Sequence, residues 1–105
     1  MTAVEQTRHL ATAIPGPNPS ALIDRKAAAV SRGVGTTMPV YAARAGGGIV
    51  EDVDGNRLID LGSGIAVTTI GNAAPRVAAA VAAQAGEFTH TCFMVTPYEQ
   101  YVAVC

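Results

Sequence analysis

The chain has 105 residues, of which 50% are hydrophobic, 14% charged and 5% aromatic, and its formal net charge is −1. This length allows at most one domain, and because about one residue in five is alanine, the apolar content predicts only a small core. The weak charge excludes the basic surface that nucleic-acid binding needs and the polybasic patch that a membrane surface attracts.

The sequence also lacks targeting and disulfide signals. Its first nine residues contain no apolar stretch of the kind found in signal peptides, and no apolar run reaches the roughly 18 residues of a membrane span. Two cysteines, Cys92 and Cys105, are too few for a disulfide framework. We therefore expect a cytoplasmic protein with free thiols.

The first third predicts one helix after an irregular lead-in. Residues 1–20 are expected to be a variable lead-in, and three prolines between positions 15 and 19 prevent regular structure at its end. The stretch 21–30 predicts a helix with Ser20 as its N-cap. The glycines at positions 33 and 35 end that helix.

The middle of the chain is typical of a small antiparallel sheet. Residues 40–45, 49–53 and 56–61 are three β-prone runs. Asp54-Gly55 between the last two runs predicts a two-residue type I′ hairpin turn, because that turn needs positive φ at both central residues. In this register Asp52 faces Arg57 across the strands as an ion pair.

The last third predicts two helices. Pro75 suits the first turn of one helix, and apolar residues then recur at helical spacing. Thr96 and Glu99 form a capping-box pattern at the start of the other. This second helix has no stop signal before Cys105, so we expect the sequence to be truncated within a helix.

No complete catalytic or metal motif is found. Gly62-Ser63-Gly64 lacks the later glycine of a dinucleotide loop and the second half of a serine nucleophile elbow, which favours a tight turn. His90 and Cys92 have no zinc-ligand spacing and need not face each other. Lys26, the single lysine, is expected to be solvated rather than to form a Schiff base. The carboxylates around the hairpin are interpreted as structural: Glu51, Asp52, Asp54 and Asp60.

The order of several sequence blocks nevertheless resembles a known family. Arg32-Gly33-Val34-Gly35, the block from Val53 to Val67, and His90-Thr91-Cys92-Phe93 follow one another as they do in class III pyridoxal-phosphate aminotransferases. The resemblance extends over residues 27–105. The first and last of these blocks narrow it toward the 4-aminobutyrate branch of that family.

The resemblance implies a parent enzyme of fold type I, with an α/β large domain and a smaller α+β domain. Residues 21–105 would be an α+β fragment of the small domain: an N-terminal helix, a small antiparallel sheet with the Asp54-Gly55 hairpin, and two helices. The large cofactor-binding domain would be absent. The family works as a homodimer or a dimer of dimers with pyridoxal 5′-phosphate, and its catalytic lysine would lie beyond residue 105. The fragment alone would then be inactive.

The family reaction moves the amino group of 4-aminobutyrate to 2-oxoglutarate, giving succinate semialdehyde and glutamate. By position in the family motifs, Ile65 would line the substrate pocket and Met94 would lie at its edge, where related enzymes often carry Gln. Transaminases acting on ornithine, acetylornithine, diaminobutyrate or β-amino acids share this segment, so these donors stay open. A non-catalytic interaction module is a further possibility if the chain truly ends at Cys105.

Overall fold

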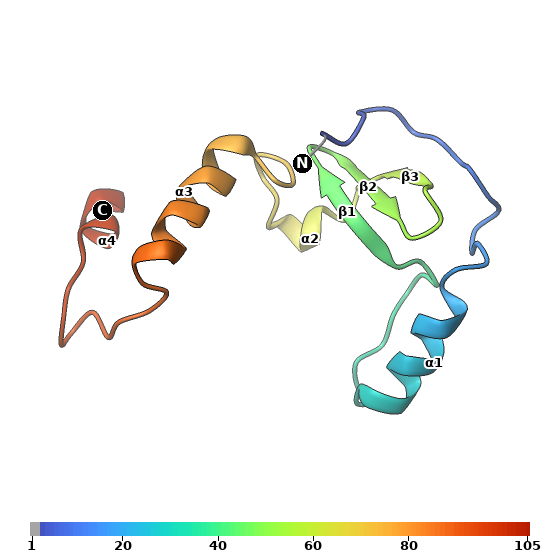
Figure 1. The fold of residues 1–105 in the computed structure, drawn as a ribbon, viewed down its shortest axis with the longest axis horizontal. Coiled ribbons are helices and arrows are strands. Elements are labelled where there is room, and N and C mark those ends of the chain that lie inside the picture. Colours follow the sequence, from blue (N-terminus) through green and yellow to red (C-terminus); the bar gives the residue numbers. More distant parts are fainter. Residues whose placement is uncertain (1–2) are drawn as a thin grey trace. The chain divides into compact units, whose positions relative to one another are not determined.

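The computed structural model describes residues 3–105, which divide into two compact units. The first unit extends to Ala74 and contains a helix, a sheet and a short helical turn (Figure 1). The second unit, Pro75–Cys105, contains two helices. Within residues 3–105, no helix combines the length and the apolar character that crossing a membrane requires.

Three short strands form the sheet of the first unit. They are β1 (Ala42–Gly46), β2 (Ile49–Asp52) and β3 (Arg57–Ile59), and they lie in the order β1-β2-β3 with both pairs antiparallel. The predicted small antiparallel sheet is therefore confirmed. Each strand is shorter than the apolar run that predicted it.

The turn between β2 and β3 differs from the predicted two-residue turn. The Gly55 N–H donates to the Asp52 carbonyl at 3.1 Å, and the Asp52 N–H donates to the Asn56 carbonyl at 2.9 Å. The loop therefore comprises residues 53–55, with Gly55 at φ 82° in the left-handed region, as in a hairpin closed by a glycine bulge. Glu51, and not Asp52, lies opposite Arg57, so the predicted Asp52–Arg57 pair is wrong.

The Asp52 carboxylate instead forms hydrogen bonds within the turn itself. Its Oδ1 accepts hydrogen bonds from the N–H groups of Asp54 (2.9 Å) and Asn56 (2.8 Å), and its Oδ2 accepts one from Asn56 Nδ2 (2.8 Å). Asp52 is 4% exposed and Asn56 is completely buried. A short polar side chain that satisfies nearby backbone donors competes with regular strand pairing. This competition explains why the loop gains a residue.

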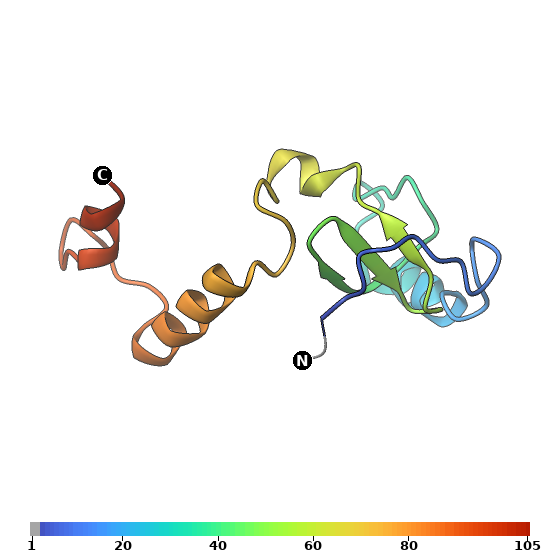
Figure 2. The same cartoon turned by 90° about the horizontal axis from the view of Figure 1, so that it is seen from above.

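The segment before the first helix, residues 4–18, contacts the sheet along its length, and we call it the N-terminal segment. Figure 2 shows it passing beside β3. His9 and Arg57 exchange two backbone hydrogen bonds, at 3.0 and 2.7 Å. Thr12 donates its N–H to Asn56 Oδ1 and accepts from Asn56 Nδ2 at Oγ1, both at 2.9 Å. Gln6 Nε2 donates to the Gly46 carbonyl at 2.9 Å.

Four stretches are helical: α1 (Ser20–Ala29), α2 (Ser63–Ala66), α3 (Pro75–Glu87) and α4 (Glu99–Val104). The predicted helix at Pro75 is confirmed. The two predicted caps are wrong. Pro19 occupies the N-cap of α1, and the Ser20 hydroxyl donates to the Pro17 carbonyl at 3.3 Å. Helix α4 begins at Glu99 after an extended Tyr98, without a side-chain cap.

Few apolar side chains are buried. Among the described residues, the buried hydrophobic side chains are Val4 and Ile49, which confirms the expected small core. In the second unit, Phe93 contacts Tyr98 and Tyr101 edge-on, with ring centroids 5.3 and 4.7 Å apart. Such edge-to-face pairs add directional stabilisation to apolar contact. Each unit is thus held by a few specific contacts rather than by a large core.

Replacing Asn56 tests the hydrogen-bond network that joins Asp52, Asn56 and Thr12. Asn56→Ala should lower the free energy of unfolding by about 2–4 kcal/mol, because it leaves Asp52 Oδ2 and the Thr12 N–H without their partner in a buried place. Asn18→Ala is the matched control: it removes one exposed hydrogen bond to the Val53 carbonyl and should cost less than about 1 kcal/mol. Urea denaturation followed by circular dichroism measures both. Equal losses would contradict the central place of Asn56.

Acid should also weaken the first unit. The Arg57 guanidinium lowers the pKa of Glu5, chiefly by a hydrogen bond, and Arg44 does the same for the pKa of Glu51. A carboxylate with a lowered folded-state pKa stabilises the fold above its unfolded pKa, and this contribution is lost as the pH falls through the folded value. Stability measured by urea titration should therefore fall on acidification below about pH 4.5, the ordinary glutamate pKa.

Substitution separates this effect from general acid unfolding. Glu5→Gln should flatten the acid-side slope of stability, because the glutamine cannot lose a charge. Glu87→Gln in α3 is the control, since the structure shows no hydrogen bond or ion pair of the Glu87 carboxylate within residues 3–105, and it should leave the slope unchanged. A Glu5→Gln profile that overlays the unsubstituted one would refute the role of the Glu5–Arg57 pair.

Candidate functional site

Asp60 shapes the loop that follows β3. Its Oδ1 accepts a hydrogen bond from the Ser63 N–H at 2.8 Å, and its Oδ2 accepts one from Asn72 Nδ2 at 3.2 Å. Its own N–H donates to the Gly48 carbonyl at 2.9 Å. One carboxylate therefore fixes both ends of residues 60–72, which we call the 60–72 loop. This agrees with the interpretation of Asp60 as structural.

A backbone-to-backbone contact closes the same loop. Gly47 and Asn72 exchange two backbone hydrogen bonds, at 2.9 and 2.8 Å. Gly71 has φ 88°, and a Cβ atom on it would lie 2.9 Å from the Gly47 Cα. Only glycine combines this backbone conformation with so close an approach. The loop is therefore tied to the β1–β2 turn at a point where no side chain fits.

The start of the 60–72 loop is a left-handed turn. Four consecutive residues, α2, have positive φ: Ser63 at 45°, Gly64 at 57°, Ile65 at 58° and Ala66 at 63°. This conformation costs roughly 1–2 kcal/mol for each residue with a Cβ atom, and it is exceptional for a β-branched one. Strained backbone of this kind gathers at functional sites, where the surrounding structure holds it in place. The sequence predicted a tight turn here but not its hand.

The first predicted site residue, Ile65, lies on this strained turn. Its side chain is 92% exposed. Other apolar side chains of the 60–72 loop are exposed as well: Leu61, Val67 and Ile70. The loop thus presents apolar groups from a backbone that hydrogen bonds hold firmly. The pocket-lining role of Ile65 stays a prediction.

The second predicted site residue, Met94, lies in the second unit between α3 and α4. Its side chain is 92% exposed. The Val95 and Thr96 N–H groups both donate to the Cys92 carbonyl at 2.9 Å, which makes a turn around Met94. Ile65 and Met94 belong to different compact units, and a pocket that they share stays a prediction.

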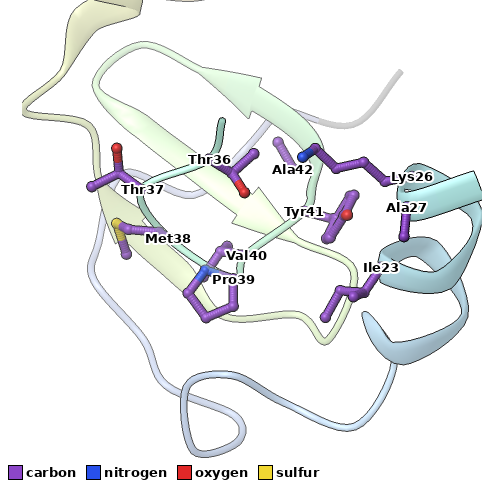
Figure 3. Close-up of a pocket in the computed structure, with 10 residues that line it drawn as sticks. All are labelled: Ile23, Lys26, Ala27, Thr36, Thr37, Met38, Pro39, Val40, Tyr41 and Ala42. Carbon is purple, nitrogen blue, oxygen red and sulfur yellow. The ribbon is translucent and has the colours of Figure 1, made fainter. Parts of the chain in front are cut away.

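A pocket of about 510 Å³ lies between α1 and the segment before β1 (Figure 3). Lys26 extends from α1 into it, partly buried, and its Nζ donates to the Val34 carbonyl at 3.1 Å. No sequence pattern indicated this pocket, which forms where residues 36–42 return beside α1. The lining residues are Ile23, Lys26, Ala27, Thr36, Thr37, Met38, Pro39, Val40, Tyr41 and Ala42.

The described residues do not fit the cofactor that the resemblance implies. Pyridoxal phosphate needs a lysine that can lose its proton in a dry site and donors that hold a phosphate. Lys26 is the single lysine of the sequence, and its ammonium group is hydrogen-bonded to a backbone carbonyl in an open pocket. A metal centre is equally unsupported, because residues 3–105 contain no cluster of three or more histidine, cysteine or acidic side chains.

Comparison with known protein families assigns the chain to one of them. The sequence model described as "Aminotransferase class-III" matches residues 29–105. The chain belongs to the class III aminotransferases. The match covers the sheet, the 60–72 loop and both helices of the second unit, and it confirms the family that the sequence blocks indicated.

Individual relatives give a finer comparison. The 4-aminobutyrate aminotransferase of Mycobacterium tuberculosis (strain ATCC 25618 / H37Rv) is 73% identical over 104 residues, which are 99% of this chain and 23% of that protein. The enzyme of the same name from Mycobacterium leprae is 68% identical over the same shares. The 5-aminovalerate aminotransferase DavT of Pseudomonas aeruginosa is 49% identical over 81 residues, 77% of this chain and 19% of that protein. The chain thus spans 23% of the length of its mycobacterial relatives.

Glycine substitution tests the strain in the left-handed turn. Ile65→Gly removes the unfavourable contact of a β-branched side chain at positive φ, whereas Ile70→Gly removes an exposed isoleucine that has no positive φ. Both variants gain the same unfolded-state entropy. Ile65→Gly should therefore be about 1–2 kcal/mol more stable than Ile70→Gly in urea denaturation. Equal stability of the two variants would show that the turn stores no strain.

Proposed function

We propose that this chain belongs to a pyridoxal-phosphate-dependent transaminase that transfers the amino group of 4-aminobutyrate to 2-oxoglutarate. The observation that supports this most strongly is the 73% identity, over 99% of the chain, to a mycobacterial 4-aminobutyrate aminotransferase. The class III match over residues 29–105 supports the reaction type independently. The products are succinate semialdehyde and glutamate.

The reaction is balanced by the two substrates. The carbon that bears the amino group in 4-aminobutyrate is oxidised to an aldehyde, and the keto carbon of 2-oxoglutarate is reduced to an amine. Pyridoxal phosphate supplies the electron sink that makes this exchange possible when it is bound. We propose that the residues that bind it, including the catalytic lysine, correspond to the part of the relatives that this chain does not span.

In this proposal Ile65, on the 60–72 loop, contributes an apolar group to the wall of the substrate pocket. Ile65 packs against the methylene chain of the amino donor, and Met94 lies at the edge of the same pocket. Two features support the role of Ile65: its side chain is 92% exposed, and its backbone is fixed by the left-handed turn. A wall built on a rigid element positions a substrate better than a wall on a mobile loop.

A five-carbon amino donor is the second candidate. The 49% identity to a 5-aminovalerate aminotransferase favours it over ornithine, acetylornithine, diaminobutyrate and β-amino acids. Those four kinds of donor carry additional or differently placed polar groups, which an apolar wall does not satisfy. One methylene group changes binding in an apolar pocket by only about 1–3 kcal/mol, so an apolar wall that contains Ile65 discriminates weakly between four- and five-carbon donors.

We further propose a cytoplasmic homodimer or dimer of dimers. The support is the number of large apolar side chains that this chain leaves exposed on the 60–72 loop and in the second unit, among them Leu61, Val67 and Val95. Where such side chains gather in one patch, the patch usually marks an interface. The remainder of the subunit and a partner subunit are the surfaces that would cover it.

The activity is tested on the complete reading frame. The coding DNA is read past the codon for Cys105, and the full product is assayed for glutamate and succinate semialdehyde formed from 4-aminobutyrate and 2-oxoglutarate. Ile65→Gln should lower kcat/KM for 4-aminobutyrate by about 10-fold or more, because a polar group enters an apolar wall. Ile70→Gln on the same loop is the control and should leave kcat/KM unchanged.

The results of these assays distinguish the proposed donor, the proposed role of Ile65 and the proposed catalytic activity. A product that uses 5-aminovalerate better than 4-aminobutyrate selects the second candidate. An Ile65→Gln product whose kcat/KM for 4-aminobutyrate is unchanged removes Ile65 from the pocket while leaving the reaction intact. A stop codon directly after Cys105 removes the catalytic proposal altogether and leaves a non-catalytic interaction module.

A further inference from the structure

The hairpin loop contains an aspartate followed directly by glycine. Gly55 carries no side chain, and nothing lies within 4 Å of the place where its Cβ atom would be. In such a pair the backbone nitrogen of the glycine is open to approach by the aspartate side chain, because no Cβ substituent shields it. This is the sequence in which aspartate most readily isomerises through a cyclic imide.

The Asp54 carboxylate is held at only one of its oxygens. Oδ1 accepts a hydrogen bond from the Asn18 N–H at 3.0 Å. Oδ2 is buried and has no hydrogen-bond partner among the described residues. Oδ2 therefore lacks the kind of hydrogen bond that holds Oδ1, and it is the oxygen that the reaction below removes as water.

The N-terminal segment covers this group. A Cβ atom added to Gly16 would overlap the Asp54 carboxylate, so the backbone of Gly16 lies directly against it. The Asn18 side chain also donates to the Val53 carbonyl at 3.3 Å. In addition, the Gly55 N–H is engaged with the Asp52 carbonyl. While residues 16–18 stay in place, the carboxylate cannot swing toward the Gly55 nitrogen.

We propose that Asp54–Gly55 is a site of spontaneous aspartate isomerisation, controlled by whether residues 16–18 cover the Asp54 carboxylate. In the first step the Gly55 nitrogen attacks Asp54 Cγ, the C–N bond forms, and Oδ2 leaves as water with the carboxyl proton and the amide proton. In the second step water adds to the imide at the carbonyl carbon of the Asp54 backbone, the bond from that carbon to the Gly55 nitrogen breaks, and the nitrogen takes up a proton, giving isoaspartate. No oxidant, reductant or cofactor is needed, and this inference is independent of the transaminase proposal.

The product differs from the starting loop in a defined way. Isoaspartate adds one methylene group to the backbone, and the carboxylate moves from the side chain to the α-carbon. The three-residue loop then loses the spacing that closes it, and Asn18 loses the Oδ1 acceptor. Isomerisation thus releases residues 16–18 and cannot be reversed by re-docking them.

The test is an ageing experiment on the 105-residue chain at neutral pH. Samples are digested at intervals, and the peptide carrying residue 54 is analysed by electron-transfer fragmentation, which distinguishes isoaspartate from aspartate. Gly16→Ala displaces the Asp54 side chain from its cover and should raise the isomerisation rate severalfold. Gly35→Ala is the matched control, because nothing lies within 4 Å of its Cβ position, and it should leave the rate unchanged.

A synthetic peptide of residues 49–60 lacks residues 16–18 and therefore gives the isomerisation rate of an unprotected Asp54. It should isomerise faster than the folded chain. A Gly16→Ala rate equal to that of the unsubstituted chain would overturn the proposal. Absence of isoaspartate from the peptide would overturn it too. Circular dichroism shows whether Gly16→Ala is folded. If it is unfolded, the isomerisation rate of the unsubstituted chain is compared with that of the peptide. Equal rates would overturn the proposal that residues 16–18 protect Asp54, and a slower rate in the folded chain would support it.

Discussion

One buried amide, that of Asn56, holds the first unit together. Its side chain joins Asp52 in the hairpin turn to Thr12 in the N-terminal segment, and its backbone closes the turn. Because the described residues bury only Val4 and Ile49 as apolar side chains, this network does what a hydrophobic core does elsewhere. Hydrogen bonds are directional, and a buried network that is only partly satisfied is costly in free energy. The network therefore favours one backbone arrangement over similar alternatives. The network thereby joins the N-terminal segment to the turn between β2 and β3.

Sequence reasoning succeeded where the signal was local and periodic. The antiparallel sheet, the helix from Pro75 and the family followed from strand patterns, helical spacing and ordered blocks. The hairpin type failed because the Asp52 side chain took the turn donors that a two-residue loop would have left to water. The docking of residues 4–18 depends on contacts such as Thr12–Asn56, which join positions 44 residues apart. No local pattern reports such a pairing.

The candidate site likewise combines features that the sequence predicted with features that it did not. Family blocks pointed to Ile65 and Met94, but nothing in Gly62-Ser63-Gly64 announced four successive left-handed residues. The Asp60 carboxylate accepts hydrogen bonds from both ends of this loop, a contact that no local pattern reports. The glycines at positions 46–48 and 71 were the available clue, because isolated glycines beside strands often mark close backbone approach. The chemistry of amino transfer needs groups that residues 3–105 do not supply.

The contact between Gly47 and Gly71 has an evolutionary consequence. A Cβ atom on Gly71 would meet the Gly47 backbone, and one on Gly47 would meet the Gln6 amide. Every single-base change of a glycine codon that still encodes an amino acid either keeps glycine or adds at least that atom. A change at Gly47 cannot relieve a clash at Gly71, because glycine has no side-chain volume to give up.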